Sequence, residues 1–244
     1  MKADWRKSGW AVRRPTPRLG CVRHLLTALF CLFAPAAQAC EVALVIALDV
    51  SRSVDKYEYV LMRNGIGAAL LDDEVIDLIG WMPGGMMVTV TQWGGLGQQR
   101  QPIGWSHLTD RESVVSFVER LVKIDRGFWM ADTSVSEALL HAESQFRKSD
   151  RFCGRRVIDV SGDGISNAGP KVRPISITLG RQGITINGLV VDGARPDPVA
   201  YFLTEVIRGP LSFVEIADGY EDYERAMKRK LLRELAPNLS RLDR

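Results

Sequence analysis

Short apolar runs alternate along the chain with amphipathic stretches, and each kind of segment predicts a different secondary structure. The apolar runs are rich in valine and isoleucine, which is typical of strands that are buried on both faces. The amphipathic stretches repeat apolar residues at helical spacing. We therefore predict strands at 42–50, 86–93, 99–103, 156–161, 184–191 and 212–216, and helices at 56–71, 109–122, 134–146, 175–181, 199–207 and 220–235, with 72–80 as a helix end or connection.

The alternation of strands and helices predicts the fold class. It indicates an α/β protein with a doubly wound, mostly parallel central sheet and helices on both faces. The run at 99–103 is the exception, because it follows a glycine string at 94–97 that we interpret as a hairpin tip. We expect it to be an antiparallel strand at the edge of the sheet. The chain has 244 residues and no visible internal repeat, so one folded domain is expected.

The first apolar run, VALVIAL at 42–48, is followed by oxygen-bearing side chains at alternate positions, namely Asp49, Ser51 and Ser53. A buried parallel strand delivers such residues to the carboxyl edge of the sheet, where open α/β folds place their ligands. Carboxylate and hydroxyl oxygens suit hard divalent cations such as Mg²⁺. A simpler interpretation stays open, in which Ser53 or Asp55 is only the N-cap of the helix that starts near Tyr57.

Two later segments carry residues of the same kind. A loop ends at Asp132 and Thr133, and a helix begins with Ser134, so that Thr133 or Ser134 could serve only as a helix cap. Further along, the strand at 156–161 ends in a Ser-Gly-Asp-Gly turn, where Asp163 could be an ordinary turn residue. Each segment lies at a predicted strand end or helix entry.

The motifs DVSRS at 49–53 and IDVSGDG at 158–164 resemble those of von Willebrand factor type A domains, and more closely those of exported bacterial proteins of unknown function, the DUF1194 group. The resemblance covers nearly all of the chain beyond residue 40. It implies a metal-ion-dependent adhesion site (MIDAS) holding Mg²⁺ or Mn²⁺. Hydroxyls would bind the cation directly, and carboxylates mainly through water or one of them directly. The implied ligands are Ser51, Ser53 and Thr133 for the hydroxyls and Asp49 and Asp163 for the carboxylates.

One position departs from the family pattern. Asp132 stands where many members have glycine, and its charge could make it an outer ligand of the cation. The resemblance implies a protein-binding module, not an enzyme, whose cation accepts an Asp or Glu carboxylate from a partner protein. A module without a functional metal is one alternative.

A hydrolase is the other alternative, in which either Ser51 or Ser161 is the nucleophile or the metal activates a water molecule. The chain has no G-x-S-x-G motif, and we expect structural roles for His107 and His141.

Charge is distributed unevenly along the chain. Residues 1–39 contain seven Lys and Arg and one Asp, so the chain's net charge of +3 becomes about −3 beyond residue 39. This balance argues against nucleic-acid binding. The basic start, the apolar stretch at 25–33 and the Ala-Gln-Ala sequence at 37–39 predict a signal peptide at 1–39 and a mature domain at 40–244. The protein is then periplasmic or secreted, with membrane contact only through an uncleaved leader or lipidation of Cys40.

Two of the four cysteines, Cys40 and Cys153, lie outside the predicted leader. Each stands just before an apolar strand. If these strands are parallel neighbours, their starts lie side by side and the thiols come within bridging range. We therefore predict a Cys40–Cys153 disulfide in an oxidising compartment, with two free thiols as the alternative.

Overall fold

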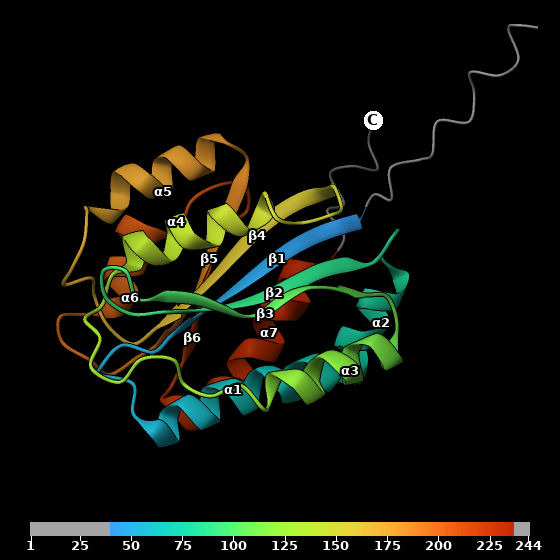
Figure 1. The fold of residues 1–244 in the computed structure, drawn as a ribbon, viewed down its shortest axis with the longest axis horizontal. Coiled ribbons are helices and arrows are strands. Elements are labelled where there is room, and N and C mark those ends of the chain that lie inside the picture. The colour runs from blue at the N-terminus through green and yellow to red at the C-terminus, as the bar shows by residue number, and fades with distance from the viewer. Residues whose placement is uncertain (1–39, 237–244) are drawn as a thin grey trace, which may run out of the picture. The chain divides into compact units, whose positions relative to one another are not determined.

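A computed structural model describes residues 40–236, and the predicted leader at 1–39 lies outside the described residues. The described chain forms a six-stranded sheet in the order β3-β2-β1-β4-β5-β6 (Figure 1). All neighbouring strands are parallel except β2 and β3, which are antiparallel. The strands are β1 (Cys40–Asp49), β2 (Met86–Trp93), β3 (Gln99–Leu108), β4 (Cys153–Gly162), β5 (Ile184–Val191) and β6 (Val214–Ala217).

The order of the strands creates a switch point between β1 and β4. From β1 the chain builds β2 and β3 on one side, and then it returns to build β4, β5 and β6 on the other. Connections at such a point diverge and leave a crevice at the carboxyl ends of the two central strands. In this chain, the β1 end is Asp49 and the β4 end is Gly162. Four of the predicted metal ligands, Asp49, Ser51, Ser53 and Asp163, therefore lie at or just after the ends of the two strands that border the crevice.

Helices cover both faces of the sheet (Figure 1). Helices α1, α2, α3 and α7 pack against one face and α4 and α5 against the other. The helices are α1 (Lys56–Leu71), α2 (Asp73–Trp81), α3 (Arg111–Leu121), α4 (Val135–Phe146), α5 (Val172–Arg181), α6 (Pro198–Tyr201), which continues into a π-helical turn (Phe202–Val206), and α7 (Tyr223–Leu235), which follows a 3₁₀ turn (Tyr220–Asp222). None of the helices between residues 40 and 236 has the length and apolar character that a membrane crossing requires.

Strand β1 is apolar throughout because both of its faces are buried. Leu44 and Ile46 pack with the helices on one face, whereas Val45 and Ala47 pack with α4 on the other. A strand in this position needs apolar residues at successive positions instead of alternate ones. The predicted fold class, an α/β protein with a mostly parallel sheet and one antiparallel edge strand, is confirmed.

Two segments differ from the sequence prediction. Strand β3 runs to Leu108, beyond the predicted end at residue 103, although it contains Pro102 and Gly104. An edge strand tolerates these residues, because one side of its backbone does not need to pair. The register with β2 shifts on both sides of Val90, the partner of Ile103. The segment predicted as a helix end or connection is a separate helix, α2. It begins because Asp72 accepts a hydrogen bond from the backbone N–H of Glu74 (3.0 Å).

A disulfide joins Cys40 and Cys153, whose Cα atoms lie 4.3 Å apart. The two residues are direct partners in the parallel register of β1 and β4. The bridge closes a sequence separation of 113 residues and ties together the amino ends of the two central strands. It therefore lies at the edge of the sheet opposite the β1–β4 crevice.

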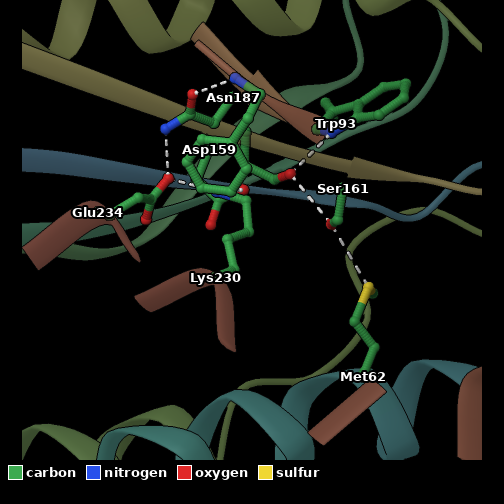
Figure 2. A network of polar contacts seen from close by, with 9 residues as sticks. Met62, Trp93, Asp159, Ser161, Asn187, Lys230 and Glu234 are labelled. Carbon is green, nitrogen blue, oxygen red and sulfur yellow. Dashed lines mark hydrogen bonds and ion pairs between the residues drawn. The ribbon is translucent and has the colours of Figure 1, made fainter. Parts of the chain in front are cut away.

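A charged cluster is buried between the sheet and α7 (Figure 2). The Lys230 ammonium lies 2.8 Å from Asp159 Oδ1 and also contacts Glu234. The Asn187 side-chain amide donates to Glu234 Oε1 (2.6 Å). Lys230 is fully buried, so its charge depends on these two carboxylates for compensation. We call Asp159, Asn187, Lys230 and Glu234 the buried charge cluster.

The buried charge cluster makes stability depend on pH. Burial raises the pKa of Asp159 to about 7; Lys230 opposes this shift and Glu234 adds to it. The folded protein thus retains a proton that the unfolded chain releases near pH 4. The stability that this proton contributes is present near pH 4 and is lost as the pH rises towards 7.

We therefore expect the free energy of unfolding of the wild type, relative to Asp159→Asn, to fall as the pH rises from 4 to 7. Urea denaturation of both proteins across this range measures the difference. A difference that stays constant from pH 4 to pH 8 would show that Asp159 has an ordinary pKa in the folded protein.

Candidate metal centre

Asp49 is the last residue of β1 and is almost completely buried. Its Oδ1 accepts a hydrogen bond from the backbone N–H of Ser51 (2.7 Å). Its Oδ2 is buried and has no hydrogen-bond partner within residues 40–236. A buried carboxylate oxygen without a partner carries a desolvation cost, which a cation would relieve. Gly162 leaves room beside this oxygen, since a Cβ there would lie 3.2 Å from Asp49 Oδ2.

The electrostatic surroundings of Asp49 also favour a cation. Burial, together with the nearby Asp163 carboxylate, raises the pKa of Asp49 to about 7. The hydrogen bonds from Ser51 and the charge of Arg126 act in the opposite direction. Two carboxylates in one partly desolvated site repel each other unless a proton or a metal ion lies between them.

Hydroxyl groups connect Asp163 to the residues after β1. The hydroxyl oxygens of Ser51 and Ser53 lie 3.2 Å apart, and Ser53 Oγ donates to Asp163 Oδ1 (2.8 Å). Ser51 is buried, whereas Ser53 is exposed and Asp163 partly so. These contacts join two loops that are 110 residues apart in the sequence. One side of the group is open to solvent, so an external ligand can reach it.

The choice between a helix cap and a site residue is decided for Ser53. Asp55 caps α1: its Oδ1 accepts from the backbone N–H of Glu58 (2.8 Å), and the Glu58 carboxylate accepts from the backbone N–H of Asp55 (2.7 Å). This reciprocal arrangement satisfies the first turn of the helix without Ser53. The Ser53 hydroxyl is thus available to Ser51 and Asp163.

Thr133 lies in a third loop, which is bound to the other two. The backbone N–H of Arg52 donates to Ala131 O (2.9 Å), which attaches this loop to the residues after β1. Thr133 N donates to Asn167 Oδ1 (2.9 Å), and Asn167 N donates to Thr133 O (2.9 Å), which attaches it to the loop after β4. The three predicted segments therefore meet at the carboxyl edge of the sheet.

The side chains of this third loop make fewer contacts with the other candidate metal ligands than its backbone does. Within residues 40–236, the Thr133 hydroxyl makes no hydrogen bond to Asp49, Ser51, Ser53 or Asp163. Asp132 is exposed. Ser134 precedes α4 but makes no capping hydrogen bond with its side chain. Hydrogen bonds connect the side chains of Ser51, Ser53 and Asp163. Asp49 lies next to them and accepts a hydrogen bond from the backbone N–H of Ser51. Thr133 is held at the same edge of the sheet by the backbone hydrogen bonds of its loop.

Two residues near this group have no counterpart in the sequence analysis. Arg126 Nη2 donates to Val50 O (3.1 Å) and Ser51 O (2.7 Å), so it holds the backbone that carries Asp49 and Ser51. Tyr220 is buried, and burial together with the charges of Asp163 and Asp49 raises the pKa of its hydroxyl. Neither residue belongs to a motif. Arg126 reaches the site from 75 residues away in the sequence, and no local signal could have identified it.

The serines considered as nucleophiles lie in unsuitable surroundings. Ser161 is buried, and its hydroxyl contacts Ala47 O (3.3 Å) and Met62 Sδ (3.6 Å; Figure 2). His107 Nε2 contacts Gly84 O (2.8 Å). His141 lies in α4, and within the described residues neither histidine contacts Ser51 or Ser161. The geometry therefore offers these serines no histidine base.

The donor set of this group is compatible with a hard divalent cation. Residues 40–236 contain no cluster of three or more His, Cys, Asp or Glu side chains that could hold a metal. A cation at this edge would depend on hydroxyl oxygens together with two carboxylates. Such all-oxygen ligands suit Mg²⁺ and Mn²⁺ better than softer metals. The unpartnered Asp49 Oδ2 and the space beside it fit a cation of this kind.

Comparison with solved structures shows the same fold in several proteins. Proximal thread matrix protein 1 from the mussel byssus, in a form with a zinc-occupied MIDAS motif, is 16% identical with a TM-score of 0.60, and the match covers 81% of this chain and 46% of the mussel protein. A von Willebrand factor type A structure from Catenulispora acidiphila is 15% identical with a TM-score of 0.56, covering 78% and 42%. The conserved hypothetical protein BatB from Bacteroides thetaiotaomicron is 16% identical with a TM-score of 0.52, covering 80% and 98%.

These similarities and the topology show that the described residues have a fold like that of von Willebrand factor type A structures. The chain spans about half the length of the mussel protein it matches. No curated protein matches the chain. A family model described as "Protein of unknown function (DUF1194)" matches residues 39–239, so the chain belongs to the DUF1194 family. The predicted family resemblance is thereby confirmed.

Proposed function

We propose that this protein is a cation-dependent binding module that takes a carboxylate group of a partner protein. The cation, Mg²⁺ or Mn²⁺, would be held by Asp49, Ser51, Ser53, Thr133 and Asp163, with Asp132 near the outer side of the site. One observation carries the proposal: Asp49 Oδ2 is buried without a hydrogen-bond partner, beside a second carboxylate and two hydroxyls. That arrangement is costly without a cation and favourable with one.

The mixture of hydroxyls and carboxylates determines what the cation can do. Neutral hydroxyl ligands leave most of the cation's charge uncompensated, so that it attracts a further anionic oxygen. The exposed side of the site at Ser53 gives such a ligand access. An Asp or Glu side chain of a partner protein supplies an oxygen of this kind. Zinc occupies the MIDAS motif of the mussel protein. In this chain the all-oxygen donor set favours Mg²⁺ or Mn²⁺.

The cellular setting of this proposal rests on the sequence. The basic and apolar leader at 1–39 favours export, and the Cys40–Cys153 disulfide is consistent with an oxidising compartment. The partner would then be a periplasmic, surface or secreted protein. No chemical step is part of this function.

Titration calorimetry of the purified protein with MnCl₂ and MgCl₂ tests the metal site. We expect saturable binding in the wild type and an affinity lower by about 10- to 100-fold or more in Asp49→Asn, because the variant loses the carboxylate charge. Asp77→Asn is the matched control, since Asp77 is exposed on α2, outside the three loops. Equal binding by Asp49→Asn and Asp77→Asn would contradict the metal site.

The carboxylate ligand is tested separately, in a pull-down from periplasmic extract with the wild type and Asp49→Asn, each with Mg²⁺ or with EDTA. We expect a partner that the wild type retains only with Mg²⁺. A partner retained equally in EDTA and by Asp49→Asn would contradict cation-dependent recognition.

A further inference from the structure

A pocket of about 420 Å³ lies at the amino ends of β4 and β5, at the edge of the sheet opposite the candidate metal centre. Three arginines line it: Arg155 and Arg156 near the start of β4, and Arg233 in the last turns of α7. Arginine guanidinium groups bind phosphate and carboxylate oxygens through paired N–H donors. Three of them around one pocket create a positively charged site that the proposed metal function does not use.

Two of these arginines, Arg156 and Arg233, form no ion pair with a carboxylate within the described residues. The Arg233 guanidinium carbon lies 3.9 Å from the centre of the Phe213 ring, which fixes its plane. Arg156 Nη2 donates to Gln182 O, and its guanidinium carbon lies 5.9 Å from the Phe146 ring centre. Neutral groups therefore orient both guanidinium groups, and no neighbouring carboxylate compensates their positive charge.

Arg155 is the most buried of the three. Its Nη1 donates to Glu234 O (2.9 Å), and its Nε lies 3.5 Å from Glu41 Oε1. Its Nη2 is buried and has no hydrogen-bond partner within the described chain. The contacts with Glu234 and Glu41 hold the Arg155 guanidinium in the wall of the pocket, whereas Arg156 and Arg233 have no carboxylate partner there within residues 40–236.

The rest of the lining also suits an anion. Ser212 brings a hydroxyl group to the wall of the pocket, whereas the Thr185 hydroxyl donates to Pro210 O (3.1 Å). The acidic side chain in the lining, Glu234, is buried and paired with Lys230, so its charge is compensated. A single carboxylate occupies one guanidinium fork, whereas a phosphate offers three or more oxygens and up to two charges.

We propose that this pocket binds a phosphate-bearing ligand between Arg155, Arg156 and Arg233. The phosphate belongs either to a small molecule or to the headgroup of an anionic phospholipid. The pocket acts independently of the candidate metal centre, because the two lie at opposite ends of the central strands.

The experiment measures binding of two probes in the presence of EDTA, which keeps phosphate away from any bound cation. Inorganic phosphate is titrated by calorimetry, and vesicles of phosphatidylglycerol are tested by co-sedimentation against vesicles of phosphatidylcholine. We expect at least one probe to bind, and Arg156→Gln and Arg233→Gln each to weaken that binding by about tenfold or more. Phosphate binding identifies a small-molecule site, and binding to phosphatidylglycerol vesicles alone identifies a lipid headgroup site.

Arg229→Gln is the matched control. Arg229 lies one turn before Arg233 on α7, outside the pocket, and pairs with Glu215 at 3.3 Å. Its replacement should leave binding unchanged, since a site depends on position and not on net charge. The proposal is overturned if neither probe binds, or if Arg229→Gln weakens binding as much as Arg233→Gln does. Arg155 is left intact because its bond to Glu234 O also supports α7.

Discussion

Replacement of Lys230 by methionine is expected to lower the free energy of unfolding by about 3–5 kcal/mol at pH 7. The substitution nearly preserves the volume of the side chain but removes the one positive charge between Asp159 and Glu234. These carboxylates would remain buried with no cation to compensate them, which is the costly way to break a buried ion pair. Urea denaturation of the wild type and Lys230→Met measures the loss.

Lys228→Met provides the matched control on the same helix. Lys228 is half-buried, at the surface of α7, and pairs with Asp72 (2.9 Å) and Glu74 (3.0 Å). Ion pairs at the protein surface contribute little, so this variant should remain close to the wild type in stability. The double variant Lys230→Met/Asp159→Asn should recover part of the lost free energy of unfolding, because it removes one of the two buried acidic groups left without a cation. Equal stabilities of Lys230→Met and Lys228→Met would refute the structural importance of the buried charge cluster.

Loss of the Cys40–Cys153 disulfide is expected to lower the free energy of unfolding by about 2–5 kcal/mol. The bond closes a separation of 113 residues, so in its absence the unfolded chain gains many conformations. The measurement compares urea denaturation of the wild type with and without dithiothreitol. The Cys40→Ser/Cys153→Ser double variant should resemble the reduced wild type and be insensitive to the reductant. Peptide mapping by mass spectrometry identifies the bridge directly.

A wild type whose stability does not change on reduction would contradict this expectation. So would a double variant that responds to dithiothreitol as strongly as the wild type, because the reductant would then act on some other group.

Much of the fold could be predicted because its signals are local. The continuous apolar run of β1 indicates a strand buried on both faces, and β4 and β5 carry the same signal. The edge of the sheet was predicted less well. Strand β3 is polar and interrupted by Pro102, and its extension to Leu108 depends on pairing with β2, which no local pattern encodes.

The residues of the candidate site also differ in whether a local sequence signal could identify them. Asp49, Ser51, Ser53 and Asp163 stand in short motifs at strand ends, so the sequence could nominate them, and the structure brings them together. The contribution of Arg126 depends on a loop that folds back over Val50 and Ser51. Tyr220 arrives from the segment before α7. Such residues reach the site only through tertiary folding, so no local sequence motif could predict their contribution.

Strand β4 has charged residues of opposite sign at its two ends. It begins beside Arg155 and Arg156 and is followed directly by Asp163, and its ten residues span about 33 Å at about 3.3 Å per residue. A partner attached at one pole of the domain would leave the other pole accessible. Within residues 40–236, ligands bound at the two proposed sites would be separated by about the length of this strand.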